Sequence, residues 1–270
     1  MKIKDKVAIV TGAASGIGNA VCHRLAAAGA RAIAMVDLTD AIQDSAQTLN
    51  TAAGAELAVP FQGNVTHSDF RSKVYAEMGD IGVVQICVPA AGILRDALAI
   101  KTNKETGKVQ LYDEQLFRQV LEVNLMHPVY WSMELMAGIA EFRAAQGLGK
   151  WSADEEIQGA SILVGSVSCR GNRGQISYSS AKAALNAAAK TLNIEGAYHG
   201  MQAKIIHPGF VETPMVEQLP DGMFEQHLRR LVPIDRMIKP EEIANTIALM
   251  IENPIISGPV WADGGLPPMA

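Results

Sequence analysis

The chain has 270 residues, of which 49% are hydrophobic and 19% are charged, and its formal net charge is −5. This composition is that of a globular protein, and the length suits one large domain, so we expect a single domain over residues 1–270. The negative charge argues against a general nucleic-acid surface, because proteins that bind phosphate backbones usually carry a concentrated basic excess.

No membrane span, secretion signal or metal site is expected. A span needs about 20 consecutive apolar residues, and the apolar run near the N-terminus, KVAIV at 6–10, is much shorter. Cys22, Cys87 and Cys169 are too scattered for a disulfide framework, which favours reduced thiols and a cytoplasmic protein. The six histidines lack the spacing of metal ligands.

Short apolar runs alternate with helix-like stretches along the chain. The runs are continuously apolar, as buried parallel strands tend to be, and they span 6–10, 32–37, 58–65, 82–92, 160–166 and 203–209. Helices are predicted over 17–28, 68–78, 114–142, 179–199 and a segment that begins at Pro240. This order predicts an α/β fold, a doubly wound parallel sheet with helices on both faces.

One segment, 98–113, departs from this order. Two short strand-like runs flank a polar turn that contains Asn103 and Gly107, which predicts a β-hairpin insertion. Charged turns are usually only solvated, so we expect no direct function of it.

The stretch TGAASGIG at 11–18 follows the first predicted strand and opens a helix. Glycines at 12, 16 and 18 allow a sharp turn and the close approach of a pyrophosphate, and the helix N-terminus presents N–H groups to it. The spacing is not that of the usual dinucleotide fingerprint, so a plain tight turn is the alternative.

Asp37 ends the second strand, about 20 residues after the glycines, where an acid binds ribose hydroxyls. A carboxylate repels a 2′-phosphate, so this residue favours NAD over NADP. Arg24 or Arg31 could still approach in space, and a strand-end turn without function is the further alternative.

Tyr178 and Lys182 are four residues apart in SYSSAK, which places them on one face of a predicted helix. A neighbouring ammonium favours the phenolate, so the pair suits proton exchange with an alcohol, although such pairs also arise by chance. Ser166 ends a predicted strand at the sheet edge where open α/β folds bind ligands.

In this order, the motifs resemble those of the short-chain dehydrogenase/reductase family, and within it the 3-oxoacyl-carrier-protein reductases. The resemblance covers nearly the whole chain and rests on TGAASGIG, Asp37, NV at 64–65, AAG at 90–92, Asn124, Ser166, YSSAK, HPGFVETPM at 207–215 and ADGG at 262–265. It implies a Rossmann-type fold, an NAD(H)-dependent interconversion of a secondary alcohol and a ketone, a homotetramer, and a substrate lid over 213–233.

The resemblance also implies a role for each matching residue. Tyr178 would be the acid/base, and Lys182 would bind the nicotinamide ribose and lower the tyrosine pKa. Ser166 would orient the substrate oxygen, and Asn124 would hold a relay water. The remaining contacts to the cofactor would come from Gly12, Ser15, Gly16, Ile17 and Gly18 at the pyrophosphate, Asp37 at the adenosine ribose, Asn64 and Val65 at the adenine, Ala91 and Gly92 at the ribose, and Pro208, Gly209, Val211 and Thr213 at the carboxamide.

Several questions stay open. Ser168 competes with Ser166, and Pro89 and Ala90 stand where the family usually has two asparagines. An acyl thioester on a carrier protein would call for a basic docking surface, with Arg170, Arg173, Arg229 and Arg230 as candidates. An NADPH-dependent reductase and a nucleotide-binding sensor without turnover are the alternative functions.

Overall fold

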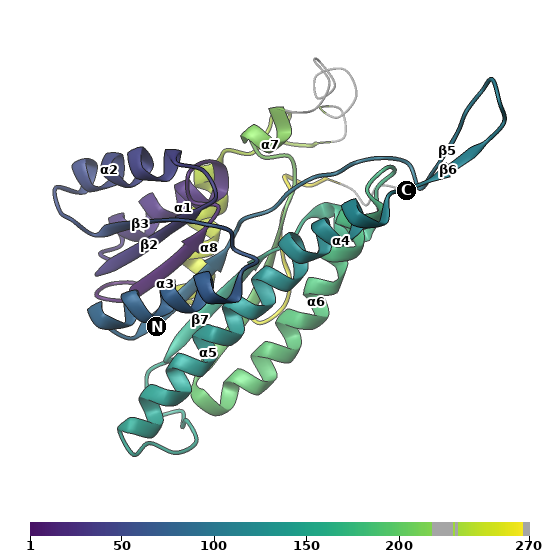
Figure 1. Cartoon of the computed structure of the whole chain (residues 1–270). Helices are drawn as coiled ribbons and strands as arrows, with labels where there is room; N and C mark the ends of the chain where they lie inside the picture. The colour runs from purple at the N-terminus through teal and green to yellow at the C-terminus, as the bar shows by residue number, and fades with distance from the viewer. Residues whose placement is uncertain (218–228, 230–231, 267–270) are drawn as a thin grey trace.

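The computed structural model describes residues 1–217, 229 and 232–266. Its centre is a seven-stranded sheet in the order β3-β2-β1-β4-β7-β8-β9, with every neighbouring pair parallel (Figure 1). The strands are β1 (Val7–Thr11), β2 (Ala32–Asp37), β3 (Ala58–Gln62), β4 (Val84–Pro89), β7 (Gly159–Val164), β8 (Met201–Pro208) and β9 (Val260–Ala262). The doubly wound α/β fold predicted from the sequence is confirmed.

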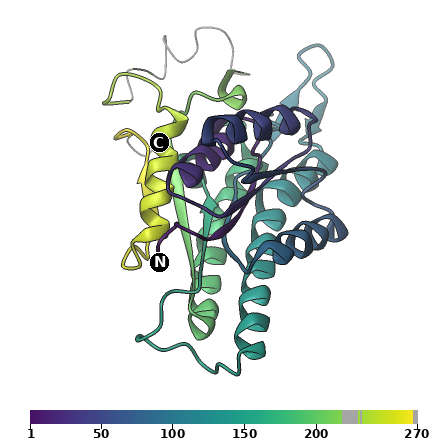
Figure 2. The same ribbon diagram turned by 90° about the vertical axis from the view of Figure 1, so that its left-hand side faces the viewer.

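Helices cover both faces of the sheet (Figure 2). One face packs against α1 (Gly16–Ala27), α2 (Ala41–Ala53) and α8 (Pro240–Glu252), and the other against α3 (Ser68–Ile81), α5 (His127–Ala145) and α6 (Ile176–Gly196). Alternate residues of β1 belong to the two cores, with Ala8 and Val10 in the first and Val7 and Ile9 in the second. The continuous apolar runs of the sequence are therefore explained by strands that are buried on both sides.

The segment 98–113 contains two short antiparallel strands, β5 (Ile100–Thr102) and β6 (Val109–Leu111), which project from the body (Figure 1). Every residue of both strands is exposed. The lid expected over 213–233 lies mainly outside the described residues. Of that segment, α7 (Pro214–Glu217) closely follows β8.

The single helix predicted over 114–142 is wrong in one respect. The structure has α4 (Glu114–Leu121), then a π-helical turn, η1 (Glu122–Met126), and then α5, whose second residue is Pro128. A π turn adds a residue to the helical repeat and is common at functional sites. Here it carries Asn124.

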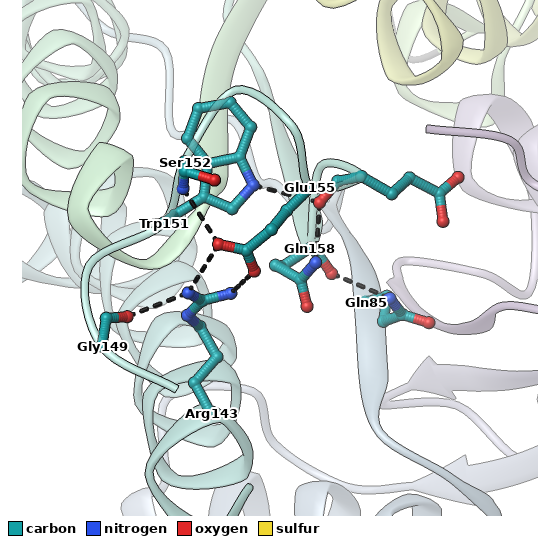
Figure 3. A network of polar contacts seen from close by, with 8 residues as sticks. Gln85, Arg143, Gly149, Trp151, Ser152, Glu155 and Gln158 are labelled. Carbon is teal, nitrogen blue, oxygen red and sulfur yellow. Dashed lines mark hydrogen bonds and ion pairs between the residues drawn. The ribbon is translucent and has the colours of Figure 1, made fainter. Parts of the chain in front are cut away.

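The loop between α5 and β7 is fixed by a polar network at the end of the sheet where β7 begins (Figure 3). The guanidinium of Arg143, which is 2% exposed, donates to the Glu155 carboxylate and, at 2.9 Å, to the carbonyl oxygen of Gly149. The Ser152 N–H donates to the same carboxylate at 2.9 Å. Since this loop precedes β7, it lies opposite the carboxyl ends of the strands.

Within the described ranges, no helix combines the length and the apolar character that a membrane crossing needs.

Candidate active site

Two adjoining cavities lie at the carboxyl ends of the central strands. The larger has a volume of about 480 Å³ and the smaller about 300 Å³, and they share six lining residues, Ile17, Ala90, Gly92, Leu94, Thr213 and Met215. The larger cavity is lined by Gly12, Ser15, Gly16, Gly18, Asp37, Asn64, Val65 and Ala91. The smaller is lined by Ser166, Tyr178, Lys182, Pro208, Gly209 and Val211. The structure thus brings together every predicted site residue except Asn124.

The turn after β1 is too tightly packed for any residue larger than glycine. Gly12 has φ of 66°, and a Cβ added to it would lie 2.8 Å from the Cα of Ala91. A Cβ on Gly18 would lie 2.2 Å from the carbonyl oxygen of Gly12. Although their spacing differs from the usual fingerprint, these glycines therefore allow the backbone to pack closely in this turn.

The N-terminus of α1 opens onto the larger cavity. Its N-cap, Ser15, has an extended backbone and makes no capping hydrogen bond to the described residues, and the first turn carries no acid. The first N–H groups of a helix have no partner within the helix and sit at the positive end of its dipole. This end of the cavity fits an anionic group.

Asp37 stands at the end of β2, at the edge of the larger cavity. One carboxylate oxygen accepts a hydrogen bond from the Ala14 N–H at 3.1 Å, and the other accepts from the N–H and the hydroxyl of Thr39, both at 3.1 Å. These hydrogen bonds from Ala14 and Thr39 fix the position of the Asp37 carboxylate at the edge of the cavity.

Neither arginine considered for a 2′-phosphate is among the residues that line these two cavities. Arg24 donates from Nε to the Asn245 side chain at 3.0 Å. Arg31 precedes the first residue of β2, whereas Asp37 is the last, so the two lie at opposite ends of that strand.

A buried histidine that the sequence did not single out links the end of β1 to the segment that follows β4. His127 Nδ1 lies 3.0 Å from the carbonyl oxygen of Val123, which can only accept, so Nδ1 carries the proton. Nε2 then accepts from the Thr11 hydroxyl at 2.9 Å, and the Thr11 oxygen accepts from the Ala91 N–H at 3.2 Å. Burial lowers the His127 pKa to about 3, which keeps the ring neutral. This series of hydrogen bonds fixes the backbone of Ala91. It does so without the two asparagine side chains that the family usually has where this sequence has Pro89 and Ala90.

Asn64 and Val65 form a short turn beside the cavity. The Asn64 carboxamide oxygen accepts from the N–H of Thr66 at 3.0 Å and from its hydroxyl at 2.9 Å. The Val65 carbonyl oxygen accepts from the indole of Trp131 at 2.9 Å. The turn is thereby attached to α5.

Tyr178 and Lys182 lie on the buried face of α6, with 8% and 5% of their surfaces exposed. Burial raises the Tyr178 pKa to about 12; a hydrogen bond with Ser166 opposes this shift and the Asp96 charge adds to it. Burial lowers the Lys182 pKa to about 8. Lys182 Nζ donates to the Val164 carbonyl oxygen at 2.7 Å and lies 5.6 Å from the centroid of the Tyr178 ring. The Tyr178 pKa is therefore raised overall, because burial of the phenol is the largest contribution, and the lowering expected from Lys182 stays a prediction.

The geometry favours Ser166 over Ser168 as the serine that orients the substrate oxygen, but not for the reason expected from the sequence. Strand β7 ends at Val164, so Ser166 does not end it; Ser166 is the N-cap of a 3₁₀ helix, η2 (Val167–Arg170). Its hydroxyl accepts from the Ser168 N–H at 3.1 Å, it lines the same cavity as Tyr178, and its interaction with the phenol acts to lower the Tyr178 pKa. Ser168 is 6% exposed and supports the loop.

Asn124 is completely buried. Its carboxamide oxygen accepts from the Ile93 N–H at 3.2 Å, and its nitrogen donates to the carbonyl oxygens of Ile93 at 3.0 Å and Val120 at 3.1 Å. The side chain thus joins η1 to the segment after β4.

A polar wall of the smaller cavity was also not anticipated. Gln175 donates to the Asp96 carboxylate at 2.7 Å and accepts from Asn172 at 2.9 Å. Partial burial raises the Asp96 pKa, and the bond from Gln175 opposes that shift. These residues come from two loops, so their proximity depends on the fold.

The candidate docking arginines are dispersed. Arg173 is exposed and lines the smaller cavity, whereas the Arg170 guanidinium lies 3.7 Å from the centre of the Trp261 ring. Arg229 pairs with Asp235 at 2.8 Å. Arg230 lies outside the described residues.

Comparison with known proteins agrees with this geometry. Residues 6–223 match the family described as short chain dehydrogenase. The 3-oxoacyl-[acyl-carrier-protein] reductase of Thermotoga maritima is 33% identical over 272 residues, which cover 98% of this chain and 99% of that protein. The (3R)-3-hydroxyacyl-CoA dehydrogenase of Mus musculus is 29% identical over 283 residues and 98% of each chain.

Similarity in fold extends equally far. A short-chain type dehydrogenase/reductase from Mycobacterium marinum superposes with a TM-score of 0.79 at 24% identity, over 98% of this chain and 96% of that one. Because the family match spans most of the sequence and a relative aligns over its whole length, the chain belongs to the short-chain dehydrogenase family, in the branch similar to 3-oxoacyl-carrier-protein reductases.

Proposed function

We propose that the protein is an NAD(H)-dependent oxidoreductase that interconverts a ketone and a secondary alcohol, with Tyr178 as the acid/base. The observation that carries this proposal is that the hydroxyl-bearing side chains of Tyr178 and Ser166 line the same cavity, which adjoins the larger cleft. A carbonyl oxygen placed between these hydroxyls would have a proton donor on one side and an orienting donor on the other.

A nicotinamide dinucleotide fits the larger cleft. The N-terminus of α1 would receive the pyrophosphate, Asp37 the adenosine ribose, and Asn64 and Val65 the adenine. The nicotinamide would be received by Thr213, which lines both cavities, and by Pro208 and Gly209, which line the smaller cavity together with Tyr178. When bound, the cofactor would supply or accept the hydride at the carbon of the substrate.

NAD is proposed rather than NADP because of the charge at Asp37. Its carboxylate is fixed by Ala14 and Thr39 at the edge of the cleft, where it would accept hydrogen bonds from both ribose hydroxyls and repel a 2′-phosphate. Arg24 and Arg31 are engaged or placed elsewhere. An NADPH-dependent reductase is therefore the alternative that this charge disfavours.

The raised pKa of Tyr178 keeps its hydroxyl protonated at neutral pH, which suits proton donation to the oxygen of a ketone during reduction. Lys182 would place a positive charge beside the tyrosinate that forms, and would bind the nicotinamide ribose. Ser166 would hold the substrate oxygen. Asn124 would keep the segment at Ile93 in place, in addition to the relay role that the family resemblance implies.

A 3-oxoacyl or 3-hydroxyacyl thioester is the proposed substrate class. The names of the Thermotoga maritima and Mus musculus relatives point to it. The smaller cavity offers apolar walls from Val167, Phe210 and Met215, which suit an acyl chain, and Arg173 at its edge suits an anionic carrier.

We also propose a homotetramer in the cytoplasm. Tyr130 and Met133 of α5 and Ile194 of α6 are exposed apolar residues on helices at the same face of the sheet, which supports a helix-mediated contact. Light scattering after size exclusion tests the tetramer, and a monomeric mass would contradict it.

The reaction and the cofactor are tested together. Oxidation of NADH and of NADPH is followed at 340 nm with acetoacetyl thioesters, 3-oxoacyl thioesters of increasing length, and simple ketones. We expect turnover with NADH that is fastest with the thioesters. NADPH as the better cofactor would contradict the assignment of Asp37, and tight NADH binding without turnover on the panel would favour a sensor.

A further inference from the structure

His207, near the end of β8, is completely buried against the backbone that carries Ser166. A Cβ added to Gly165 would come within 2.4 Å of His207 Nδ1, so the ring packs directly on the chain just before the serine. Nδ1 lies 3.2 Å from the Ser166 nitrogen and 3.1 Å from the Ser166 carbonyl oxygen, and Nε2 lies 2.9 Å from the Asn186 carboxamide oxygen. The ring therefore joins the Ser166 backbone to α6, the helix of Tyr178 and Lys182.

Both tautomers of this ring bond the Ser166 backbone, and the Asn186 carboxamide favours one of them. Asn186 uses its nitrogen to donate to the Ala183 carbonyl oxygen at 3.2 Å, which directs its oxygen at His207. That oxygen only accepts, which favours the proton on Nε2, and Nδ1 then accepts from the Ser166 N–H at 3.2 Å. With the proton on Nδ1, the ring would instead donate to the Ser166 carbonyl oxygen at 3.1 Å, so in either form it bonds the backbone of Ser166. Burial lowers the His207 pKa to about 4; the hydrogen bond to the Ser166 backbone opposes this shift and the charges of Lys182 and Arg170 add to it, so the ring is neutral near pH 7.

The His207 ring also stacks on an aromatic side chain of the neighbouring strand. Trp261 of β9 stacks on His207, with ring centroids 4.3 Å apart and an angle of 21° between the planes. The guanidinium of Arg170 lies 3.7 Å from the centre of the Trp261 ring. Since Ser166 precedes η2 and Arg170 ends it, both ends of this loop are attached to one stack.

We propose that His207 is a positioning residue, which fixes the backbone of Ser166 so that the serine hydroxyl stays in the cavity that it shares with Tyr178. The inference rests on the proposed function, in which Ser166 orients the substrate oxygen. Orientation of this kind is sensitive to small displacements, because a shift of about 1 Å at a reacting group can cost about 100-fold in rate.

Three substitutions separate positioning from simple packing. In His207→Asn the carboxamide oxygen can take the place of Nδ1 and accept from the Ser166 N–H, whereas His207→Gln reaches Asn186 but leaves Ser166 without its acceptor. We expect His207→Ala and His207→Gln to lower kcat about tenfold or more, and His207→Asn to retain most of it. The KM for NADH should change less than about twofold in all three.

A matched control accounts for lost stability. Ile139 is buried on α5 beside Gly159, at the opposite end of β7 from Ser166, so Ile139→Ala should lower Tm without lowering kcat. A kcat that follows Tm across all four variants, with no rescue by His207→Asn, would overturn the proposal.

A double-mutant cycle with Ser166→Ala tests the route of the effect. If His207 acts through Ser166, His207→Ala should cost about tenfold in the wild type but less than about twofold in the Ser166→Ala background. The full loss in both backgrounds would overturn the role of His207 alone. A wild-type kcat in Ser166→Ala itself would instead overturn the role proposed for Ser166, and this inference with it.

Discussion

The ammonium nitrogen of Lys182 lies 5.6 Å from the ring centroid of Tyr178 and donates its hydrogen bond to the carbonyl oxygen of Val164. The two side chains share a buried face of α6, and burial moves their pKa values apart, with Lys182 lowered to about 8 and Tyr178 raised to about 12. Between these values Tyr178 is still a proton donor while Lys182 loses its charge.

This relation predicts the pH dependence of reduction. Lys182 is charged below about pH 8 and neutral above it, so kcat/KM for ketone reduction should fall as the pH rises past about 8. Lys182→Met should lower kcat about 100-fold and remove that fall. Rates measured from pH 6 to 10 decide this. A fall of the same shape in the Met variant would show that another group titrates.

Asp37 should determine cofactor preference. Hydrogen bonds to a charged group contribute about 1.5–3 kcal/mol, so Asp37→Ala should lower kcat/KM for NADH at least about tenfold. The value for NADPH should stay level or rise, because the repulsion of the 2′-phosphate is removed. Arg24→Ala is the control and should change neither value, since Arg24 bonds Asn245. Equal losses with both cofactors would indicate only local damage to the turn.

Two buried histidines should make the protein sensitive to acid. His127 and His207 have pKa values lowered to about 3 and about 4, so between those values and about 6.5 the unfolded chain binds more protons than the folded one. The free energy of unfolding should therefore fall as the pH drops below about 6.5, by up to about 1.4 kcal/mol per pH unit for each histidine. Urea denaturation from pH 7.5 to 4.5 measures the slope. His127→Gln should make it shallower, and an unchanged slope would contradict the assignment.

The loop fixed by Arg143 should contribute to stability and not to catalysis. Glu155→Gln leaves the buried guanidinium with neutral acceptors only and no opposite charge, so it should lower Tm more than Arg143→Met, which removes the buried charge (Figure 3). Because the loop lies at the opposite end of the sheet, kcat should be unchanged in both. Thermal denaturation measures the expected fall in Tm, and the 340 nm assay measures kcat, which should not change.

The strands that carry the site were predictable because they are buried on both faces. A continuous apolar run such as AIAMVD at 32–37 suits a central strand that is covered by helices on both faces. Its predicted bounds agree with β2. Strand β9 was missed because it has only three residues, Val260–Ala262, none of them fully buried. The π turn at Glu122–Met126 was missed because the apolar spacing of 114–142 continues through it.

The predicted site residues came from local motifs, and the structure places nearly all of them around the two cavities. His127 and His207 could not be found in this way. The role of His127 depends on Thr11 and Ala91, and that of His207 on Asn186 and Trp261, which are distant in sequence and meet only in the folded sheet. The direction of the Tyr178 pKa was also hidden, because it follows from burial rather than from the neighbouring lysine.

The central claim is that Tyr178 exchanges the proton with the substrate oxygen. The most direct test compares wild type and Tyr178→Phe in the NADH assay with an acetoacetyl thioester, alongside the NADH dissociation constant from fluorescence. Removing a general acid typically costs about 100- to 10,000-fold, so we expect kcat to fall by at least about 100-fold while the NADH dissociation constant changes little. Turnover at the wild-type rate in Tyr178→Phe would contradict the mechanism and leave Tyr178 as a packing residue of α6.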